Sequence, residues 1–203
     1  MTILIYNCFN WVGYHYVNYF LDKGMVVKGV DKIDSDKKEN LYMLVGRNSA
    51  FELVESYEEK KNKNSRVLII GETNDDIKAE RIIQIKTNEM RNKLEDAIVI
   101  NAPILFGEWM DMTEEGISIR NRFVRFNSED FLMDAVYITD FVKETYPLIM
   151  STNIPSEITV YSKKIFLNEA VKLENSIYIR DYIPIEKNIK KVLAHYKRFK
   201  DLY

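Results

Sequence analysis

The first thirty-one residues restrict the fold of this chain more than any other segment. Thr2 to Tyr6 is a short run of apolar and β-branched residues, which predicts a buried strand. Val12 to Lys23 has the apolar spacing of a helix, and a glycine directly after it is placed to end that helix. Met25 to Val30 predicts a second strand, which ends at Asp31. Two strands joined by a helix over so short a stretch indicate a parallel, right-handed βαβ crossover.

The rest of the chain continues to alternate predicted strands with predicted helices. Further strands are expected over residues 66–71, 97–102, 117–126, 135–138 and 158–161. Helices are expected over residues 41–60, 73–94, 139–150, 167–173 and 187–203. This alternation predicts an α/β fold with a mostly parallel sheet.

Composition narrows the class of protein. The net charge of −2 gives no basic field for nucleic acid, and we expect no nucleic-acid partner. No apolar run is long enough for a membrane span, and the N-terminus lacks the charged start of a signal peptide. The single cysteine excludes an intramolecular disulfide and fits a reducing compartment. We therefore expect a cytoplasmic protein that does not contact a membrane.

Three segments resemble the extended short-chain dehydrogenase/reductases, the NAD-dependent epimerase/dehydratases that act on sugar nucleotides. They are the opening ILIYNCFNWVGYHYVNYFLDKGMVVKGVD, the segment INAPILFG and the segment DAVYITDFV, and they follow the family's order. The resemblance implies a Rossmann-like, doubly wound sheet, smaller than in a full family member, with a small C-terminal substrate-side portion. We expect one Rossmann-like domain over 1–203, with a nucleotide-binding-type core over 1–110 and mixed core and substrate-side elements over 111–203.

The turn after the first strand departs from the family pattern G-x-x-G-x-x-G. Asn7, Asn10 and Gly13 stand at its three glycine positions. Asparagine tolerates positive φ, so the turn shape is expected to survive, and Gly13 keeps the position that packs helix on strand. The two asparagine side chains, however, are expected where phosphate oxygens should approach. The resemblance assigns the cofactor positions to Asn7, Asn10, Trp11, Val12, Gly13 and Asp31, and it predicts no cofactor or weak NAD(P) binding.

The catalytic element departs further. The family uses Tyr-x-x-x-Lys on a helix, and counting back from the strand at 97–102 matches these positions to Asn74 and Lys78. Asparagine cannot exchange a proton near neutral pH, so the catalytic tyrosine is absent. Thr73 is the match for the family's Ser/Thr. The stretch from Asp31 to the strand at 66–71 is also shorter than the family's, which predicts missing strands and a more open cleft.

Several candidate residues have two interpretations. Asp31 is either a ribose acceptor or an acid that ends a strand. Cys8 is either a reactive thiol at a helix N-terminus or a small semi-buried residue. Lys78 is either a relic of the catalytic lysine or a solvated lysine. His15 and His195 have no ligand partner at metal spacing, and we predict no metal.

Two basic segments are also ambiguous. Arg120, Arg122 and Arg125 either meet a nucleotide diphosphate or form an exposed strand face. The terminal helix over 187–203 is basic and amphipathic, and we expect it to pack through its apolar residues rather than to touch a membrane.

The sequence leaves three functions open. The first is a pseudoenzyme that kept the fold, lost redox catalysis and acts as a binding, regulatory or assembly protein beside sugar-nucleotide metabolism. The second is an NAD(P)-dependent sugar-nucleotide epimerase, dehydratase or reductase with an atypical active site. The third is a non-redox binder of a nucleotide or another small ligand. The resemblance also implies a homodimer through the helices predicted at 41–60 and 74–94.

Overall fold

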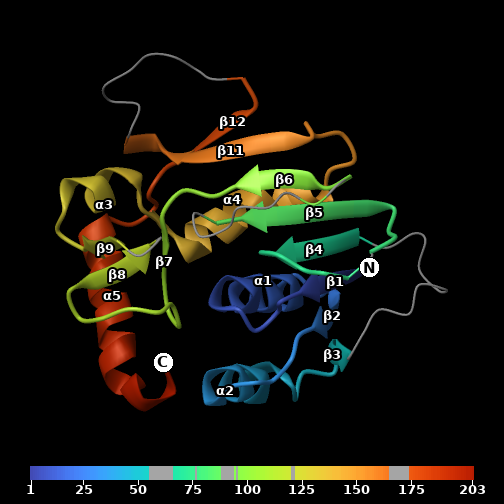
Figure 1. Ribbon diagram of the computed structural model, residues 1–203, viewed down its shortest axis with the longest axis horizontal. Helices are drawn as coiled ribbons and strands as arrows, with labels where there is room; N and C mark the ends of the chain where they lie inside the picture. The colour runs from blue at the N-terminus through green and yellow to red at the C-terminus, as the bar shows by residue number, and fades with distance from the viewer. Residues whose placement is uncertain (55–65, 76, 88–93, 95, 120–121, 165–173) are drawn as a thin grey trace. The chain divides into compact units, whose positions relative to one another are not determined.

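The computed structural model describes residues 1–54, 66–75, 77–87, 94, 96–119, 122–164 and 174–203 (Figure 1). The helices are α1 Trp11–Asp22, α2 Asp36–Val45, α3 Glu129–Asp134, α4 Ile138–Met150 and α5 Ile185–Arg198, followed by a 3-10 turn at Lys200–Leu202. The strands are β1 Thr2–Tyr6, β2 Val26–Val30, β3 Phe51–Val54, β4 Arg66–Ile70, β5 Arg81–Lys86, β6 Ile98–Asn101, β7 Leu105–Phe106, β8 Gly116–Ile119, β9 Arg122–Arg125, β10 Val136–Tyr137, β11 Glu157–Ser162 and β12 Ser176–Ile179. No described helix is both long and apolar enough to cross a membrane.

The strands confirm the predicted α/β fold and its parallel sheet. An eight-stranded sheet has the order β12-β11-β6-β5-β4-β1-β2-β3. Within this sheet the register is described for the pairs β3–β2, β2–β1, β1–β4, β4–β5 and β11–β12. All of these pairs are parallel. The order 3-2-1-4-5-6 within this sheet is the doubly wound order of dinucleotide-binding folds. The predicted βαβ crossover at the start of the chain is β1, α1 and β2.

The helix predicted over 41–60 is confirmed over residues 41–45 and wrong over residues 51–54, and residues 55–60 lie outside the described residues. The helix in this region is α2, which begins five residues earlier because Ser35 caps it, its side chain accepting from the Lys38 backbone N–H. Phe51–Val54 is strand β3, which pairs with β2 in parallel register. Apolar residues at this spacing fit a helix or a strand. The parallel pairing with β2 favours the strand. Strand β3 therefore lies in the stretch that seemed too short to contain one.

The helix predicted over 73–94 is also wrong. Its described residues contain no helix, and Arg81–Lys86 forms strand β5, whose Ile83 and Ile85 are fully buried. Strand β5 pairs with β4 in parallel register, and its isoleucines favour a pleated, buried strand. The two helices assigned to a dimer interface are therefore not present in that form.

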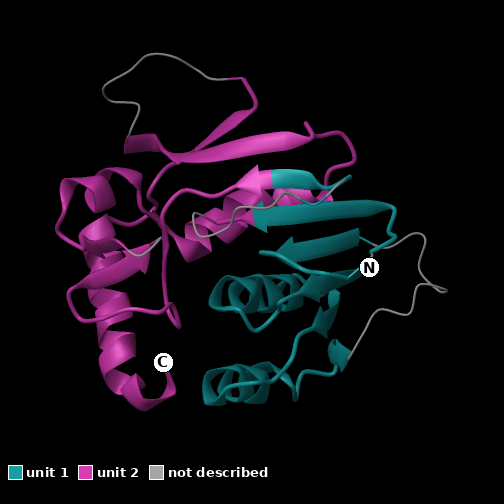
Figure 2. Cartoon of the chain, in the orientation of Figure 1, with its two compact units in different colours: residues 1–85, 91–99 teal, residues 86–90, 100–203 magenta. Residues whose placement is uncertain are grey.

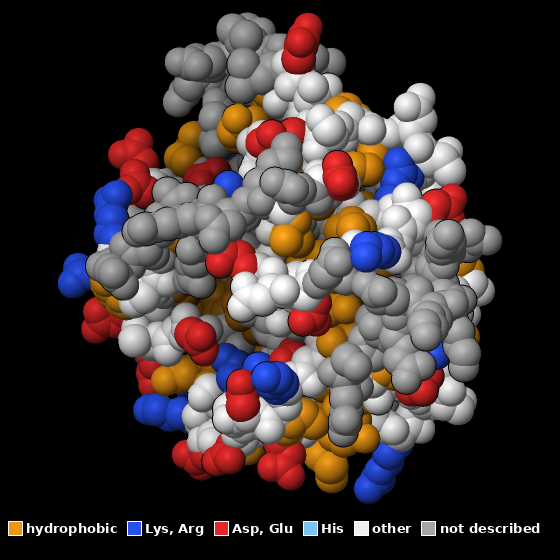
Figure 3. Space-filling view, turned by 45° about the vertical axis from the view of Figure 1, so that its right-hand side comes forward, with side chains coloured by type: hydrophobic (Ala, Val, Ile, Leu, Met, Phe, Trp, Pro, Cys, Tyr) orange, Lys and Arg blue, Asp and Glu red, His pale blue; other side chains and the backbone are white. Residues whose placement is uncertain are grey.

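The second half of the chain follows the predictions more loosely. The strand predicted over 117–126 is a hairpin of β8 and β9. The predicted helices at 139–150 and 187–203 correspond to α4 and α5, with the latter ending at Arg198. The helix predicted at 167–173 lies outside the described residues. Acidic and basic side chains are interspersed over the face shown in Figure 3, as the small net charge suggests.

The chain divides into two compact units, coloured in Figure 2. Unit 1 comprises residues 1–85 and 91–99, and unit 2 comprises residues 86–90 and 100–203. In unit 1, alternation along β1 sends Leu4 and Tyr6 to one face, where they join a buried cluster with residues of β2 and β4. Helix α1 packs on β1 and β2 and buries Val12, Gly13, Tyr16, Val17 and Phe20. In unit 2, α4 packs against β7, β10 and β12.

Candidate functional site: the turn between β1 and α1

Asn7 holds the turn that follows β1. Its φ of 54° lies in the left-handed region, so this asparagine adopts the conformation that the family pattern gives to glycine. Its side-chain amide donates to the backbone carbonyls of Ile70 and Glu72, at 2.7 and 2.9 Å. The side chain thus turns toward the carboxyl end of β4 and joins two neighbouring strands of unit 1.

Asn10 occupies the N-terminus of α1. Its Oδ1 accepts from the Val12 backbone N–H at 3.0 Å, which makes it a helix N-cap with an ordinary φ of −59°. The first N–H groups of a helix are where a phosphate binds in dinucleotide-binding turns. Here a side chain of the protein already uses one of these donors.

Gly13 is required by close packing. A Cβ at this position would lie 2.3 Å from the Asn7 carbonyl oxygen and 3.0 Å from the Cys8 Cα. Only glycine at position 13 therefore allows the helix to pack this closely on the turn backbone, which is the role of the third glycine in the family pattern. Cys8 is fully buried, and burial together with the nearby Asp31 carboxylate raises the pKa of its thiol well above the usual range. A thiol held neutral in this way favours the small-residue interpretation of Cys8 over a reactive one.

Asp31 lies at the end of β2 with both carboxylate oxygens occupied. Its Oδ2 accepts from the Phe9 N–H at 2.8 Å, and its Oδ1 accepts from the Lys32 N–H at 2.8 Å and the Lys38 ammonium at 3.0 Å. The carboxylate is only 3% exposed. A ribose hydroxyl would therefore have to displace partners that the protein itself supplies.

Lys38, which sequence reasoning missed, completes this arrangement from the first turns of α2. Its ammonium also contacts Asp34 at 3.0 Å and the Lys32 carbonyl at 3.1 Å. Burial alone would lower the pKa of Lys38, but its bonds to Asp31 and Asp34 outweigh burial and raise it. The one signal in the sequence was a lysine seven residues after a strand-ending acid, which is too common to identify a contact.

The remaining predicted cofactor residues line the start of α1. Val12 is buried at 1% exposure, and Trp11 is partly exposed with its ring edge-on to His15. The site thus contains the predicted residues of the turn together with Asp31. Because Asn10 and Asp31 already have protein partners, the residues present do not fit a dinucleotide in the manner of the glycine-rich turn.

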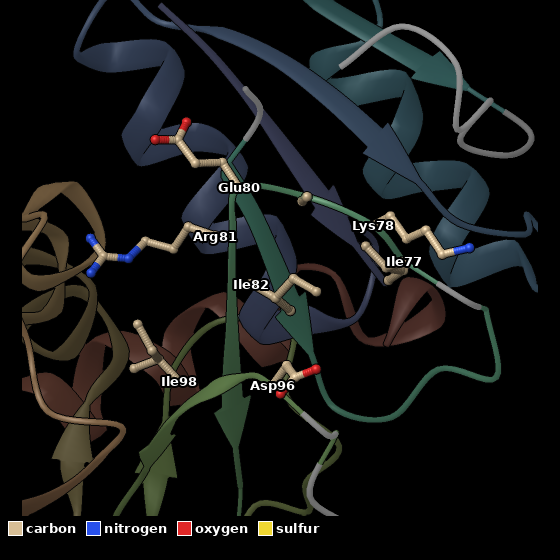
Figure 4. Close-up of a pocket in the computed structure, with 8 residues that line it drawn as sticks. Ile77, Lys78, Glu80, Arg81, Ile82, Asp96 and Ile98 are labelled. Atoms are coloured by element: carbon tan, nitrogen blue, oxygen red, sulfur yellow. The ribbon is translucent and has the colours of Figure 1, made fainter. Parts of the chain in front are cut away.

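The positions matched to the family's catalytic residues lie elsewhere in unit 1. Thr73 and Asn74 follow the carboxyl end of β4, where the Thr73 hydroxyl accepts from the Asp75 N–H at 3.2 Å. Lys78 lies just before β5 and lines a cavity near the start of that strand (Figure 4). All three belong to a connection without a described helix, so the structure does not present Asn74 and Lys78 on the helix from which they were matched.

A second polar cluster, in unit 2, was not predicted. The Tyr137 hydroxyl donates to the Glu108 carboxylate at 2.8 Å and accepts from the Lys191 ammonium at 2.8 Å, and Lys191 also contacts Glu108 at 3.0 Å. Burial raises the pKa of Tyr137. Burial would lower the pKa of Lys191, but its bonds to Tyr137 and Glu108 raise it to about 12. We name Glu108, Tyr137 and Lys191 the unit 2 cluster.

The C-terminal residue extends this region. The Tyr203 hydroxyl accepts from the Trp109 N–H at 3.0 Å and lies 2.6 Å from His195 Nδ1. Trp109 has a φ of 69°, which a bulky residue rarely adopts, and its ring stacks on Tyr203. Burial lowers the pKa of His195 and so favours its neutral ring. Among the described residues, no group of histidine, cysteine and acidic side chains is arranged to hold a metal.

The arginines of the β8–β9 hairpin are surface residues where they are described. Arg122 pairs with Asp130 at 2.8 Å, and Arg125 is exposed. Arg120 lies outside the described residues. The pairing of Arg122 with an exposed acid agrees with an exposed strand face.

Comparison with known proteins identifies the fold. No protein-family model and no curated protein sequence matches this chain. The structure is similar to a dTDP-glucose 4,6-dehydratase from Bacillus anthracis in complex with NAD, with a TM-score of 0.60 and 9% identity over 100% of this chain and 98% of that one. It is similar to a yeast methylglyoxal/isovaleraldehyde reductase complexed with NADPH, with a TM-score of 0.59 and 11% identity over 100% of both chains. A UDP-glucose 4-epimerase from Thermotoga maritima, solved with UDP-glucose, has a TM-score of 0.57 and 12% identity over 98% of this chain and 100% of that one.

These similarities confirm the expected resemblance at the level of the fold. The chain has the Rossmann-like fold of the NAD-dependent epimerases, dehydratases and reductases. Identities of 9–12% show a common fold and leave activity to be argued from the residues of the site.

Proposed function

We propose that this chain is a binding protein built on the short-chain dehydrogenase/reductase fold and that it does not catalyse NAD(P)-dependent redox chemistry. One observation carries the proposal: the polar groups of the β1–α1 turn and Asp31 bind other groups of the same protein. Asn10 caps α1, and Asp31 is held by Phe9, Lys32 and Lys38.

Binding of a dinucleotide at this turn would require an exchange of hydrogen-bond partners. A bound dinucleotide gains affinity from helix N–H groups and from a free carboxylate at the end of the second strand. In this chain a cofactor would have to break a cap bond and a buried, charge-assisted contact between Lys38 and Asp31 before forming its own. The binding free energy is what remains after such costs are subtracted, so we expect weak affinity of the turn for a dinucleotide.

The missing catalytic tyrosine supports the same proposal. The position matched to it is Asn74, which cannot transfer a proton, and the matched Lys78 lies on a connection rather than on a helix. Thr73 and Lys78 remain at most relic positions in this proposal.

The ligand class follows from the proteins of similar structure. Those structures were solved with NAD, NADPH and UDP-glucose bound. We therefore propose that any ligand of the carboxyl edge of this sheet is a nucleotide or sugar nucleotide, bound without redox chemistry. A regulatory or assembly role beside sugar-nucleotide metabolism is the corresponding cellular function.

A thermal-shift panel tests the proposal. The full chain is heated with NAD, NADP, UDP-sugars and dTDP-sugars, each at millimolar concentration. A ligand at 100 times its dissociation constant stabilises the folded state by roughly 2.7 kcal/mol. We expect no shift with NAD or NADP. A clear shift with either would overturn the proposal in favour of an atypical NAD(P)-dependent enzyme, whereas a shift with a UDP- or dTDP-sugar alone supports the non-redox binder.

Two finer expectations accompany this proposal. We propose a cytoplasmic location, from the single cysteine and the reducing compartment that it suits. We also propose a homodimer, now without the helices first assigned to its interface. Light scattering that gives 24.0 kDa at high concentration, rather than twice that mass, would exclude the dimer.

A further inference from the structure

The exposed face of helix α5, in unit 2, carries a stripe of positive charge. Its exposed cations are Lys187, Lys190, Lys191, Lys197 and Arg198, with the exposed Ala194 between them. Counted from Lys187 and again from Ala194, these positions follow the i, i+3, i+4, i+7 spacing of one helix face. The buried residues Ile185, Asn188 and Val192 lie on the other side, so the stripe points away from the core of unit 2. We name the five cations the α5 stripe.

An acidic turn lies beside the C-terminal end of this stripe. Its exposed acids are Asp111, Glu114 and Glu115, in the segment between β7 and β8 (Figure 1). Glu114 and Glu115 form the tip of the turn, which the Thr113 N–H closes by donating to the Gly116 carbonyl at 2.9 Å. The Glu114 carboxylate lies 3.2 Å from the Lys197 ammonium, and the two side chains remain 51% and 62% exposed. Both groups are therefore accessible to a further partner.

The other end of the stripe lies away from the acidic turn of the same chain. At about 1.5 Å of rise per residue, Lys190 and Lys187 lie about 10 and 15 Å before Lys197 along the helix. Glu186 is the only acid in the sequence of α5, so this end of the helix keeps an excess of cations. The acidic turn therefore neutralises one end of the stripe and leaves the other to a second partner.

A face that presents both charges side by side is self-complementary. In a two-fold dimer each contact occurs twice, so when the stripe of one copy meets the acidic turn of the other, the reverse contact forms as well. Opposite charges then meet at both places. A partner of a single sign fits this face less well, because the acidic turn would repel the phosphates of a nucleic acid or of an anionic membrane. The net charge of −2 adds little overall repulsion between two copies.

We propose that the α5 stripe and the acidic turn form the interface of a two-fold homodimer, in which the stripe of each copy contacts the acidic turn of the other. The inference rests on the homodimer proposed above and names its interface, and it is independent of what the β1–α1 turn binds. Exposed ion pairs are weak singly and are screened by salt. The dimer is therefore expected at low ionic strength and should dissociate as salt is added.

Reciprocal charge reversal tests the proposal. The stripe variant is Lys187→Glu with Lys190→Glu, and the turn variant is Glu114→Lys with Glu115→Lys. Sedimentation equilibrium at low ionic strength should give the natural chain a mass of twice 24.0 kDa. Each variant alone should self-associate at least about tenfold more weakly, because like charges then face each other. An equimolar mixture of the two variants should regain the affinity of the natural chain, because opposite charges meet again at both contacts.

The matched control reverses two exposed acids of unit 1. Asp22→Lys with Asp75→Lys changes the net charge by the same amount as the turn variant but leaves the proposed interface intact, so it should self-associate like the natural chain. A natural chain that stays at 24.0 kDa at every concentration would overturn both the interface and the proposed homodimer. A dimer that both reversals leave unchanged, or a mixture that does not regain association, would overturn the interface alone.

Discussion

The β1–α1 turn and the unit 2 cluster are both closed networks of polar groups, but they are closed by different partners. In the turn, Asn7 and Asn10 bond to backbone groups, and only Asp31 pairs with a charged side chain. In the unit 2 cluster the contacts join side chains only. The Glu108 carboxylate pairs with the Lys191 ammonium, and the Tyr137 hydroxyl bonds to both. The turn is therefore held mainly by hydrogen bonds to backbone groups, whereas the cluster is held by contacts among ionisable side chains. In both networks a carboxylate, Asp31 or Glu108, is held by protein partners that a ligand would have to displace.

Replacement of Gly13 should have the largest effect on stability. In Gly13→Ala the new Cβ would lie 2.3 Å from the Asn7 carbonyl oxygen, so helix and turn must separate. We expect a loss of about 3 kcal/mol or more in the free energy of unfolding, measured in urea. Gly24→Ala is the control: its φ of 72° is unfavourable for alanine, but no atom lies within 4 Å, and about 1 kcal/mol is expected. Equal losses in the two variants would contradict the close packing of the turn.

Removal of the Tyr137 hydroxyl should have the next largest effect. Tyr137→Phe leaves the nearly buried Glu108 carboxylate with one fewer donor, and we expect a loss of about 2 kcal/mol in the free energy of unfolding. Tyr161→Phe is the matched control. Its ring stacks on Tyr178 and its hydroxyl has no described partner, so its loss should stay below about 0.5 kcal/mol. A loss at Tyr137 no larger than that at Tyr161 would mean that the cluster does not stabilise unit 2.

Substitution of Asn7 should have a smaller effect. Asn7→Gly removes two hydrogen bonds to the end of β4, but glycine adopts the φ of 54° readily, so part of the loss is offset. We expect a net loss of about 1 kcal/mol. Asn10→Gly should lose only a few tenths of a kcal/mol, because glycine is itself an acceptable N-cap. If urea unfolding ranks the two in the opposite order, the turn is held by its helix cap rather than by β4.

The smallest effect should be a pH dependence due to His195. Burial lowers its pKa in the folded state, so on acidification the unfolded chain takes up the proton first. The contribution of His195 is therefore complete above a pH of about 6.5 and is lost as the pH falls from there through the lower folded pKa. His195→Asn, which keeps an acceptor near Tyr203, should remove this slope. A slope that persists in His195→Asn would assign the pH dependence to another group.

The sequence predicted the fold better than it predicted the elements within it. The βαβ unit of β1, α1 and β2 was predictable because Gly24 and the two apolar runs mark every boundary. Strands β3 and β5 were assigned to helices because their isolated apolar residues fit both periods, and only pairing with β2 and β4 decides for a strand. Long-range pairing of this kind is not encoded in any local window.

The candidate site was predictable in its residues but not in its contacts. Asn7, Gly13 and Asp31 were identified from their spacing alone. The partners that close the site, Ile70 for Asn7 and Lys38 for Asp31, belong to other elements and carry no motif. The unit 2 cluster joins residues 108, 137 and 191, which no spacing connects.

The central claim, that the β1–α1 turn is closed to a dinucleotide by groups of the protein, is tested most directly at the turn itself. The measurement follows the backbone amide resonances of Phe9, Val12 and Gly13 while NAD is added to millimolar concentration. These N–H groups include the two that donate to Asp31 and Asn10. The account predicts that their resonances do not change. Saturable changes at these three amides would contradict it and would show that the turn still binds the cofactor of the enzymes whose fold it shares.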